Sequence, residues 1–128
     1  MNPGEEQNER DHKVTGERTS AGDFGSRKYR HATDGGWFSW EVKALPDKPQ
    51  QLRVTYWGSD GGNRVFDIHI DGTNLTTQRL ENNKPSKFYD EVYVIPTDIT
   101  QGKDKVTVKF QAHPGAWAGG VFGLRVMK

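Results

Sequence analysis

Residues 52–72, LRVTYWGSDGGNRVFDIHIDG, consist of two alternating runs joined by a glycine-rich loop. Apolar residues occupy every second position from Leu52 in the first run and from Phe66 in the second. Successive side chains of a strand point to opposite faces, so this pattern gives each run one apolar face. The stretch therefore predicts two antiparallel β-strands connected through residues 58–63.

The same alternation recurs along most of the chain after Trp37. Asp71-Gly72 follows the second run, and such a pair between two strands is typical of a tight hairpin. No segment has the periodicity of an amphipathic helix of three turns, and residues 96–104 are expected to form a short helical turn or a wide loop. Short strands separated by turn residues favour an all-β, antiparallel β-sandwich. The predicted strands are 37–43, 51–57, 64–70, 73–80, 87–95, 104–111 and 120–127.

Length and composition fit a single domain of this class. The chain has 128 residues, which is enough for one buried core. Residues 1–23 are polar and have few apolar groups, so we expect them to be a linker or tail, partly ordered, before a single sandwich domain at 24–128. Their start lacks the apolar core of a signal peptide, which indicates either a cytoplasmic protein or a piece of a longer exported one.

The charge balance narrows the choice of partners. Lysine and arginine total 18 and aspartate and glutamate total 17, for a net charge of +1. Nucleic-acid binding relies on a basic patch that neutralises phosphates, so the sequence argues against it and against a polybasic membrane anchor. No hydrophobic run is long enough to span a bilayer.

The loop at 56–64, YWGSDGGNR, contains the first candidate ligand residues. Trp57 offers an aromatic face for the C–H face of a sugar ring, and Asp60, Asn63 and Arg64 can bond its hydroxyls. The alternative is an ordinary long hairpin loop in which Asp60 and Asn63 bond their own backbone. Both interpretations fit the residues.

The second long loop, AHPGAWAGG at 112–120, carries His113 and Trp117 among small residues. An antiparallel order brings it to the same end as the 58–63 loop and the segment 30–36. The sequence therefore predicts one rim formed by Arg30, Asp34, Trp57, Arg64, His113 and Trp117.

Trp37 lies on the same face of its predicted strand as polar residues, and Trp57 does so in its own predicted strand. Each indole is therefore predicted either to face a ligand on the outer surface or to lie under a structural cover. Trp37 completes the set of candidate ligand-binding residues.

Catalysis has little support in the sequence. The chain has no cysteine, its histidines lack metal-ligand spacing, and Ser59 is not in a G-x-S-x-G elbow. A structural calcium ion is compatible with a sandwich. However, Gly123 stands where many jelly-roll sugar-binding modules have an acidic ligand, so no clear motif supports the ion, and no cofactor is predicted.

The segments GGWFSWEVK, YWGSDGGNRVFDI and FQAHPGAWAGGVFG give a long and specific resemblance. Residues 12–128 resemble the C-terminal domain of bacterial glycoside hydrolases of the β-L-arabinofuranosidase family, glycoside hydrolase family 127, common in gut Bacteroidetes. In that family a separate α/α-barrel carries the catalytic cysteine, glutamate and zinc, so nothing catalytic transfers to this chain.

The resemblance implies a jelly-roll-type, carbohydrate-binding-module-like accessory domain of a periplasmic or extracellular hydrolase that degrades plant polysaccharides. Its expected partners are an oligosaccharide or polysaccharide and the catalytic domain of the parent chain. The alternative is a purely structural domain that packs against the catalytic barrel and has no ligand of its own.

Overall fold

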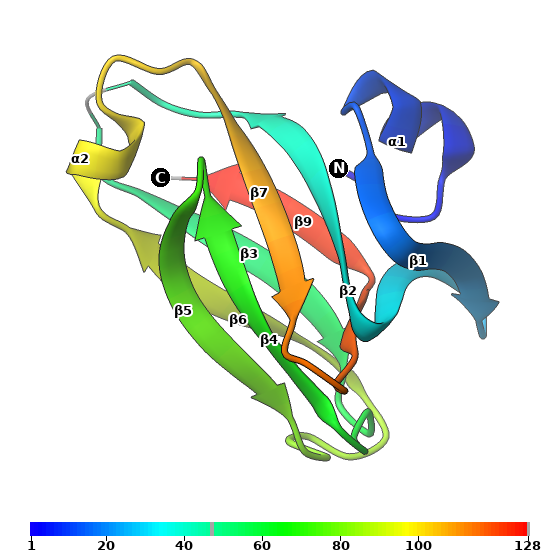
Figure 1. Cartoon of the computed structure of the whole chain (residues 1–128). Helices are drawn as coiled ribbons and strands as arrows, with labels where there is room; N and C mark the ends of the chain where they lie inside the picture. Colours follow the sequence, from blue (N-terminus) through cyan, green and yellow to red (C-terminus); the bar gives the residue numbers. More distant parts are fainter. Residues whose placement is uncertain (47, 128) are drawn as a thin grey trace.

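The computed structural model describes residues 1–46 and 48–127, and it consists of two antiparallel sheets packed face to face (Figure 1). The large sheet has the strand order β1 (Thr15–Phe24), β2 (Arg27–Lys43), β7 (Lys105–Ala112), β4 (Arg64–Ile70) and β5 (Thr73–Leu80), and β8 (Ala118–Val121) also pairs with β2. The small sheet has the order β6 (Phe88–Ile95), β3 (Gln50–Trp57) and β9 (Gly123–Met127). The prediction of an all-β antiparallel sandwich is confirmed.

The core lies between the two sheets and follows the alternation of the sequence. Along β3, Leu52, Val54 and Tyr56 are fully buried, while the residues between them are not. The ring of Phe38 stacks on that of Phe110 across β2 and β7, with centroids 5.1 Å apart. Burying a side chain of this size contributes about 1.5–3 kcal/mol, so the alternating positions supply most of the stabilising energy.

Residues 1–23 contain a helix and most of a strand where a partly ordered linker or tail was expected. Helix α1 (Glu6–Asp11) lies beside β1 and β2 in Figure 1, and β1 pairs with β2 from Thr15 to Phe24. Most side chains of β1 are exposed, so its polar composition gave no sign of a strand. Backbone hydrogen bonds to β2, the burial of Glu9 and the packing of Met1 and Val14 against the core hold the segment.

Two strands differ from their predicted limits in a way that matters for function. β2 begins at Arg27, ten residues before the predicted start at 37, and so places residues 29–31 on a strand. The predicted strand 120–127 is divided at Phe122 between β8 in the large sheet and β9 in the small one. The change of sheet at Phe122 joins the two layers at one end of the sandwich.

The remaining short helix, α2 (Thr97–Thr100), lies in the segment expected to be a helical turn or loop. Among the described residues, no helix has the length and apolar character needed to cross a membrane.

Candidate functional site

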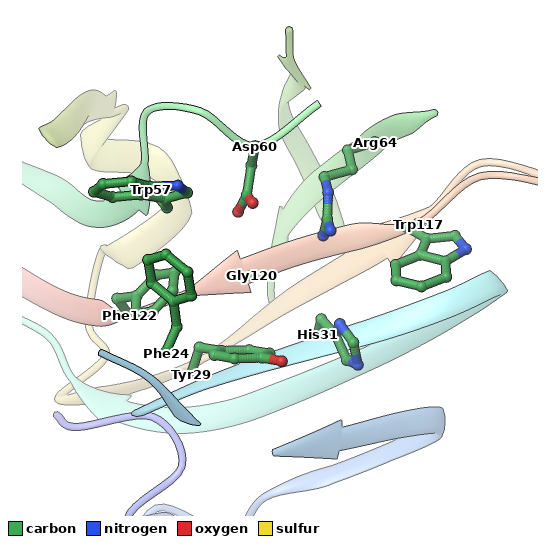
Figure 2. Close-up of a pocket in the computed structure, with 9 residues that line it drawn as sticks. All are labelled: Phe24, Tyr29, His31, Trp57, Asp60, Arg64, Trp117, Gly120 and Phe122. Carbon is green, nitrogen blue, oxygen red and sulfur yellow. The ribbon is translucent and has the colours of Figure 1, made fainter. Parts of the chain in front are cut away.

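A pocket of about 290 Å³ opens at the end of the sandwich where the chain changes sheet (Figure 2). Strands β1 and β2 supply one wall, the loop 58–63 and the start of β4 supply another, and the segment 117–122 closes the third. The lining residues are Phe24, Tyr29, His31, Trp57, Asp60, Arg64, Trp117, Gly120 and Phe122. We call this site the aromatic pocket.

Aromatic rings occupy both ends of the pocket. Figure 2 shows Trp57 and Phe24 at one end and Trp117 and His31 at the other. The Trp57 and Phe24 ring centroids are 5.1 Å apart at 50°, and the His31 and Trp117 rings meet edge to face at 5.3 Å. Tyr29 lies along the wall between the two ends. A ligand with flat apolar faces would therefore meet rings at both ends.

Arg64 and Asp60 supply the charged groups of the pocket, and Figure 2 shows both side chains pointing into it. The guanidinium of Arg64 is fixed because its Nε donates to the carbonyl of Gly61 at 3.0 Å and its Nη1 donates to that of Gly119 at 2.9 Å. It also lies 5.2 Å from the ring centroid of Trp117. The donor groups of Arg64 are thus preorganised at the pocket.

Burial and the charge of Arg64 shift the pKa values of two groups in the pocket, Asp60 and His31. Burial raises the pKa of the Asp60 carboxyl, against the opposing effects of the Arg64 charge and a hydrogen bond from the backbone of Gly120. Burial also lowers the pKa of His31 below 6.5, and the charges of Arg64 and Arg30 lower it further. His31 is therefore neutral at pH 7, and the pocket presents one acceptor and one donor of opposite charge.

Four of the predicted ligand residues come together in this pocket: Trp57, Asp60, Arg64 and Trp117. Asn63 does not line it. Its side-chain amide donates to the carbonyl of Gly115 at 3.1 Å, and its backbone carbonyl accepts from the backbone N–H of Trp117 at 2.8 Å. Asn63 therefore ties the two loops together and positions Trp117.

The other predicted residues lie elsewhere, so the predicted single rim does not form. His113 bonds Asp67 through Nε2 at 2.8 Å and lines a separate hollow with Asp34. The physical reason is strand parity, because Asp67 alternates with buried Phe66 and Ile68 and so points out of the large sheet. Arg30 is held by Glu9 away from the pocket.

Trp37 also lies outside the pocket, on the outer face of the large sheet. Lys109 covers its ring, with Nζ 4.5 Å from the ring centroid. Lys109 belongs to β7, which pairs with β2 in the same sheet, so this contact is not a cover by residues 1–23 or by a neighbouring domain.

A model of a protein family matches residues 1–127 and is described as a family of unknown function, DUF6805. The chain belongs to DUF6805. A search among curated proteins finds no significant match by sequence.

Solved structures similar to this DUF6805 domain include carbohydrate-binding modules. A family 35 module from Clostridium thermocellum has a TM-score of 0.69 at 15% identity, over 88% of this chain and 90% of that one. The family 35 module from Paenibacillus barcinonensis gives 0.65 at 14%, over 90% and 92%. The C-terminal family 6 module of a marine laminarinase from Zobellia galactanivorans gives 0.62 at 12%, over 94% and 95%. The DUF6805 domain therefore has the β-sandwich fold of carbohydrate-binding modules.

Five residues that line the DUF6805 pocket were not predicted from the sequence: Phe24, Tyr29, His31, Gly120 and Phe122. Tyr29 and His31 share one face of β2, but charged residues flank them, so this part of the sequence lacks the apolar alternation that predicts a strand. The alternation of two large rings in YRH was the available signal. Phe24 ends β1, and the composition had placed the rest of this strand in the linker or tail.

The arrangement suits recognition of a polyol with an apolar ring face. The rings can stack on C–H groups, Asp60 can accept hydrogen bonds from hydroxyls, and Arg64 can donate to ring or hydroxyl oxygens. Among residues 1–46 and 48–127, no group of three or more His, Cys, Asp or Glu side chains could hold a metal ion.

Proposed function

We propose that this DUF6805 domain is a non-catalytic module that binds a neutral sugar ring in the aromatic pocket. The observation that carries the proposal is the placement of Asp60 and the fixed Arg64 between aromatic rings at both ends of one pocket. Stacking would orient the ring, and the two charged groups would select its hydroxyls. Because the two charges are opposite and His31 is neutral at pH 7, the pocket favours a neutral ring over a charged one.

The size of the pocket limits what it holds. Its volume of about 290 Å³ is at the lower end of ligand pockets, which span roughly 300–1,000 Å³. A pocket of this size accommodates the end of a glycan or one of its rings, with the rest of the chain outside.

The wider context is also a proposal. The motif resemblance supports an accessory domain of a bacterial glycoside hydrolase acting on plant polysaccharides, exported to the periplasm or the cell exterior. The marine laminarinase from Zobellia galactanivorans carries a module of similar fold at its C-terminus. In this context the catalytic domain of the parent chain is the second partner.

The test is a titration of the domain with neutral arabinan, galactan and xylan oligosaccharides, followed by backbone amide shifts. We expect saturable shifts confined to residues 57–64 and 116–122. Trp57→Ala should weaken binding roughly tenfold because it removes a stacking face. Trp37→Ala is the matched control, since it removes a tryptophan outside the pocket and should leave affinity unchanged. Equal affinity of the Trp57→Ala variant and the unmodified domain would contradict the proposal.

A purely structural role is the second candidate, and one observation favours it. Val92 and Val94 on β6 are exposed to 43% and 71% on the outer face of the small sheet, where a neighbouring domain could cover them. The same titration separates the two functions. Absence of shifts with every neutral oligosaccharide at millimolar concentration would favour the structural role.

A further inference from the structure

A second hollow, of about 240 Å³, lies on the outer face of the small sheet beside the aromatic pocket. Three arginines line it, Arg27, Arg53 and Arg125, and we call it the arginine groove. We propose that the arginine groove binds an oxyanion carried on a glycan, either the carboxylate of a uronate or a sulfate ester. The glycan as carrier rests on the proposed function; the anion site rests on the groove alone.

The first observation is the register of β3 and β9. Arg53 and Arg125 are directly opposite each other in this antiparallel pair. Like charges at such positions repel and destabilise a sheet. On its other side Arg53 is paired with Val92, which offers no counter-charge. The register thus places two arginines opposite each other at the groove, and a bound anion would relieve the repulsion between their charges.

Asp90 is the acidic residue of the groove, and it forms an ion pair at long range with only one of the three arginines, Arg53. Its Oδ1 accepts a hydrogen bond from the hydroxyl of Thr55 at 2.5 Å, and its Oδ2 is 4.0 Å from Nε of Arg53. That distance is too long for a hydrogen bond. Three positive charges therefore face one negative charge.

The Nε atom of Arg53 gives a second, independent sign of a ligand. It is buried and has no hydrogen-bond partner within the described part of the chain. A buried donor without an acceptor is costly, and native structures rarely leave one unpaired. The Arg53 side chain as a whole is 39% exposed, so a turn of its guanidinium on binding would bring Nε to an oxyanion in the groove.

The groove is also placed to receive a group attached to a ligand of the aromatic pocket. Phe122 lines both sites. Trp57, Thr55 and Arg53 alternate along the same face of β3, so Trp57 and Arg53 are about 13 Å apart along the strand. Gly123, opposite Thr55, has no side chain to block the path. A glycan held at Trp57 can therefore extend toward Arg53.

Arg27 contributes from the large sheet at the other wall of the groove. Its guanidinium lies over the ring of Phe88, 4.4 Å from the ring centroid. This cation–π contact restrains the position of the Arg27 charge beside the groove. Met1 and Asn2 also line the groove, but the proposal depends on the three arginines.

The experiment compares ligands that differ in charge. The domain is titrated by calorimetry with galactotriose that carries one uronate residue, with galactotriose that carries one sulfate ester and with the neutral, unmodified galactotriose, at low and at high salt. We expect at least one acidic ligand to bind about tenfold more tightly than galactotriose at low salt, with the difference shrinking at high salt. The uronate and sulfate arms identify which oxyanion the groove prefers.

Arg125→Gln is the main variant because Arg125 is exposed and its loss removes a repulsion. It should abolish the preference for the acidic ligand while leaving the melting temperature equal or higher, an outcome that a merely structural arginine would not give. Arg79→Gln, on exposed β5 of the other sheet, is the matched control and should retain the preference. Arg53→Gln should likewise abolish the preference for the acidic ligand. In the unmodified domain, the NMR resonance of Arg53 Nε should shift when the acidic ligand binds.

Failure of this inference is distinguishable from failure of the proposed function. If galactotriose binds at Trp57 and neither acidic ligand binds more tightly, the arginine groove is not a glycan site and the aromatic pocket stands. If an acidic ligand binds through Arg125 while Trp57→Ala has no effect, the groove is supported and the sugar pocket is refuted. If sodium sulfate alone shifts Arg53 Nε with the affinity of the acidic glycans, the glycan part of the inference is overturned.

Discussion

Replacing Glu9 by alanine removes the carboxylate that joins α1 to the large sheet. Glu9 is only 3% exposed, and its two oxygens accept from Nε and Nη2 of Arg30 at 2.7 and 3.0 Å. One of them also accepts from the indole N–H of Trp40 at 3.2 Å. The substitution leaves a guanidinium and an indole N–H in the protein interior without their acceptor. We therefore expect the Glu9→Ala variant to be strongly destabilised.

The magnitude follows from the burial of the pair. Removing one partner of a buried ion pair costs about 3–5 kcal/mol. Arg30 retains 14% side-chain exposure and a hydrogen bond from Nη1 to the hydroxyl of Thr19 at 3.0 Å, so the lower end applies. About 3 kcal/mol in a domain of this size lowers the melting temperature by roughly 10 °C.

The assay is thermal and urea unfolding, with two companion variants. Glu6→Ala on the same helix is the matched control, because Glu6 and its partner Arg10 are exposed and should contribute no more than about 0.5 kcal/mol. Glu9→Leu combined with Arg30→Met should recover most of the loss, since no buried charge then lacks a partner. If Glu9→Ala were no more destabilised than Glu6→Ala, α1 would not belong to the cooperatively folded domain.

Two further predictions concern stability. Gln50→Ala should lower the free energy of unfolding by about 2–3 kcal/mol. The reason is that buried Gln50 accepts from the backbone amide of Leu45 at 2.9 Å and donates to the hydroxyl of Thr100 at 2.8 Å. A loss under about 1 kcal/mol in urea unfolding would contradict this bonding pattern. The second prediction is a pH dependence at His31, whose folded-state pKa is depressed by burial and by Arg64 below the 6.5 of the unfolded chain. The unfolded state therefore takes up the proton first, so this contribution to stability is fully present above pH 6.5 and is lost as the pH falls through the lowered pKa. Urea unfolding at several pH values should show the unmodified domain losing stability relative to His31→Gln below pH 6.5, and parallel curves would refute the assignment.

Strand positions in the core were predictable because burial there depends on local alternation. Phe66, Ile68 and Ile70 alternate with more polar residues, and all three are fully buried in β4. The strand β1 was not predictable in this way. It is an edge strand held by backbone pairing to β2, and its exposed side chains carry no apolar pattern.

The candidate site was predicted in part for a related reason. Trp57, Asp60, Arg64 and Trp117 lie in or beside two glycine-containing loops, where large aromatic and charged residues suggest a ligand. His113 lies in one of these loops too, yet it faces the Asp67 side of the large sheet. Which way a loop residue points depends on how the strands at both ends of the loop are paired, and local sequence patterns do not specify that pairing.

The sequence by itself determined the class of fold and the two loops that carry ligand-type residues, because strand periodicity and turn chemistry are local properties. Only the tertiary structure decided that the β1–β2 hairpin completes the aromatic pocket and that Arg53 is opposite Arg125. Both facts depend on the register between strands that are distant in the chain. That register is set by the packing of the whole sandwich and not by neighbouring residues.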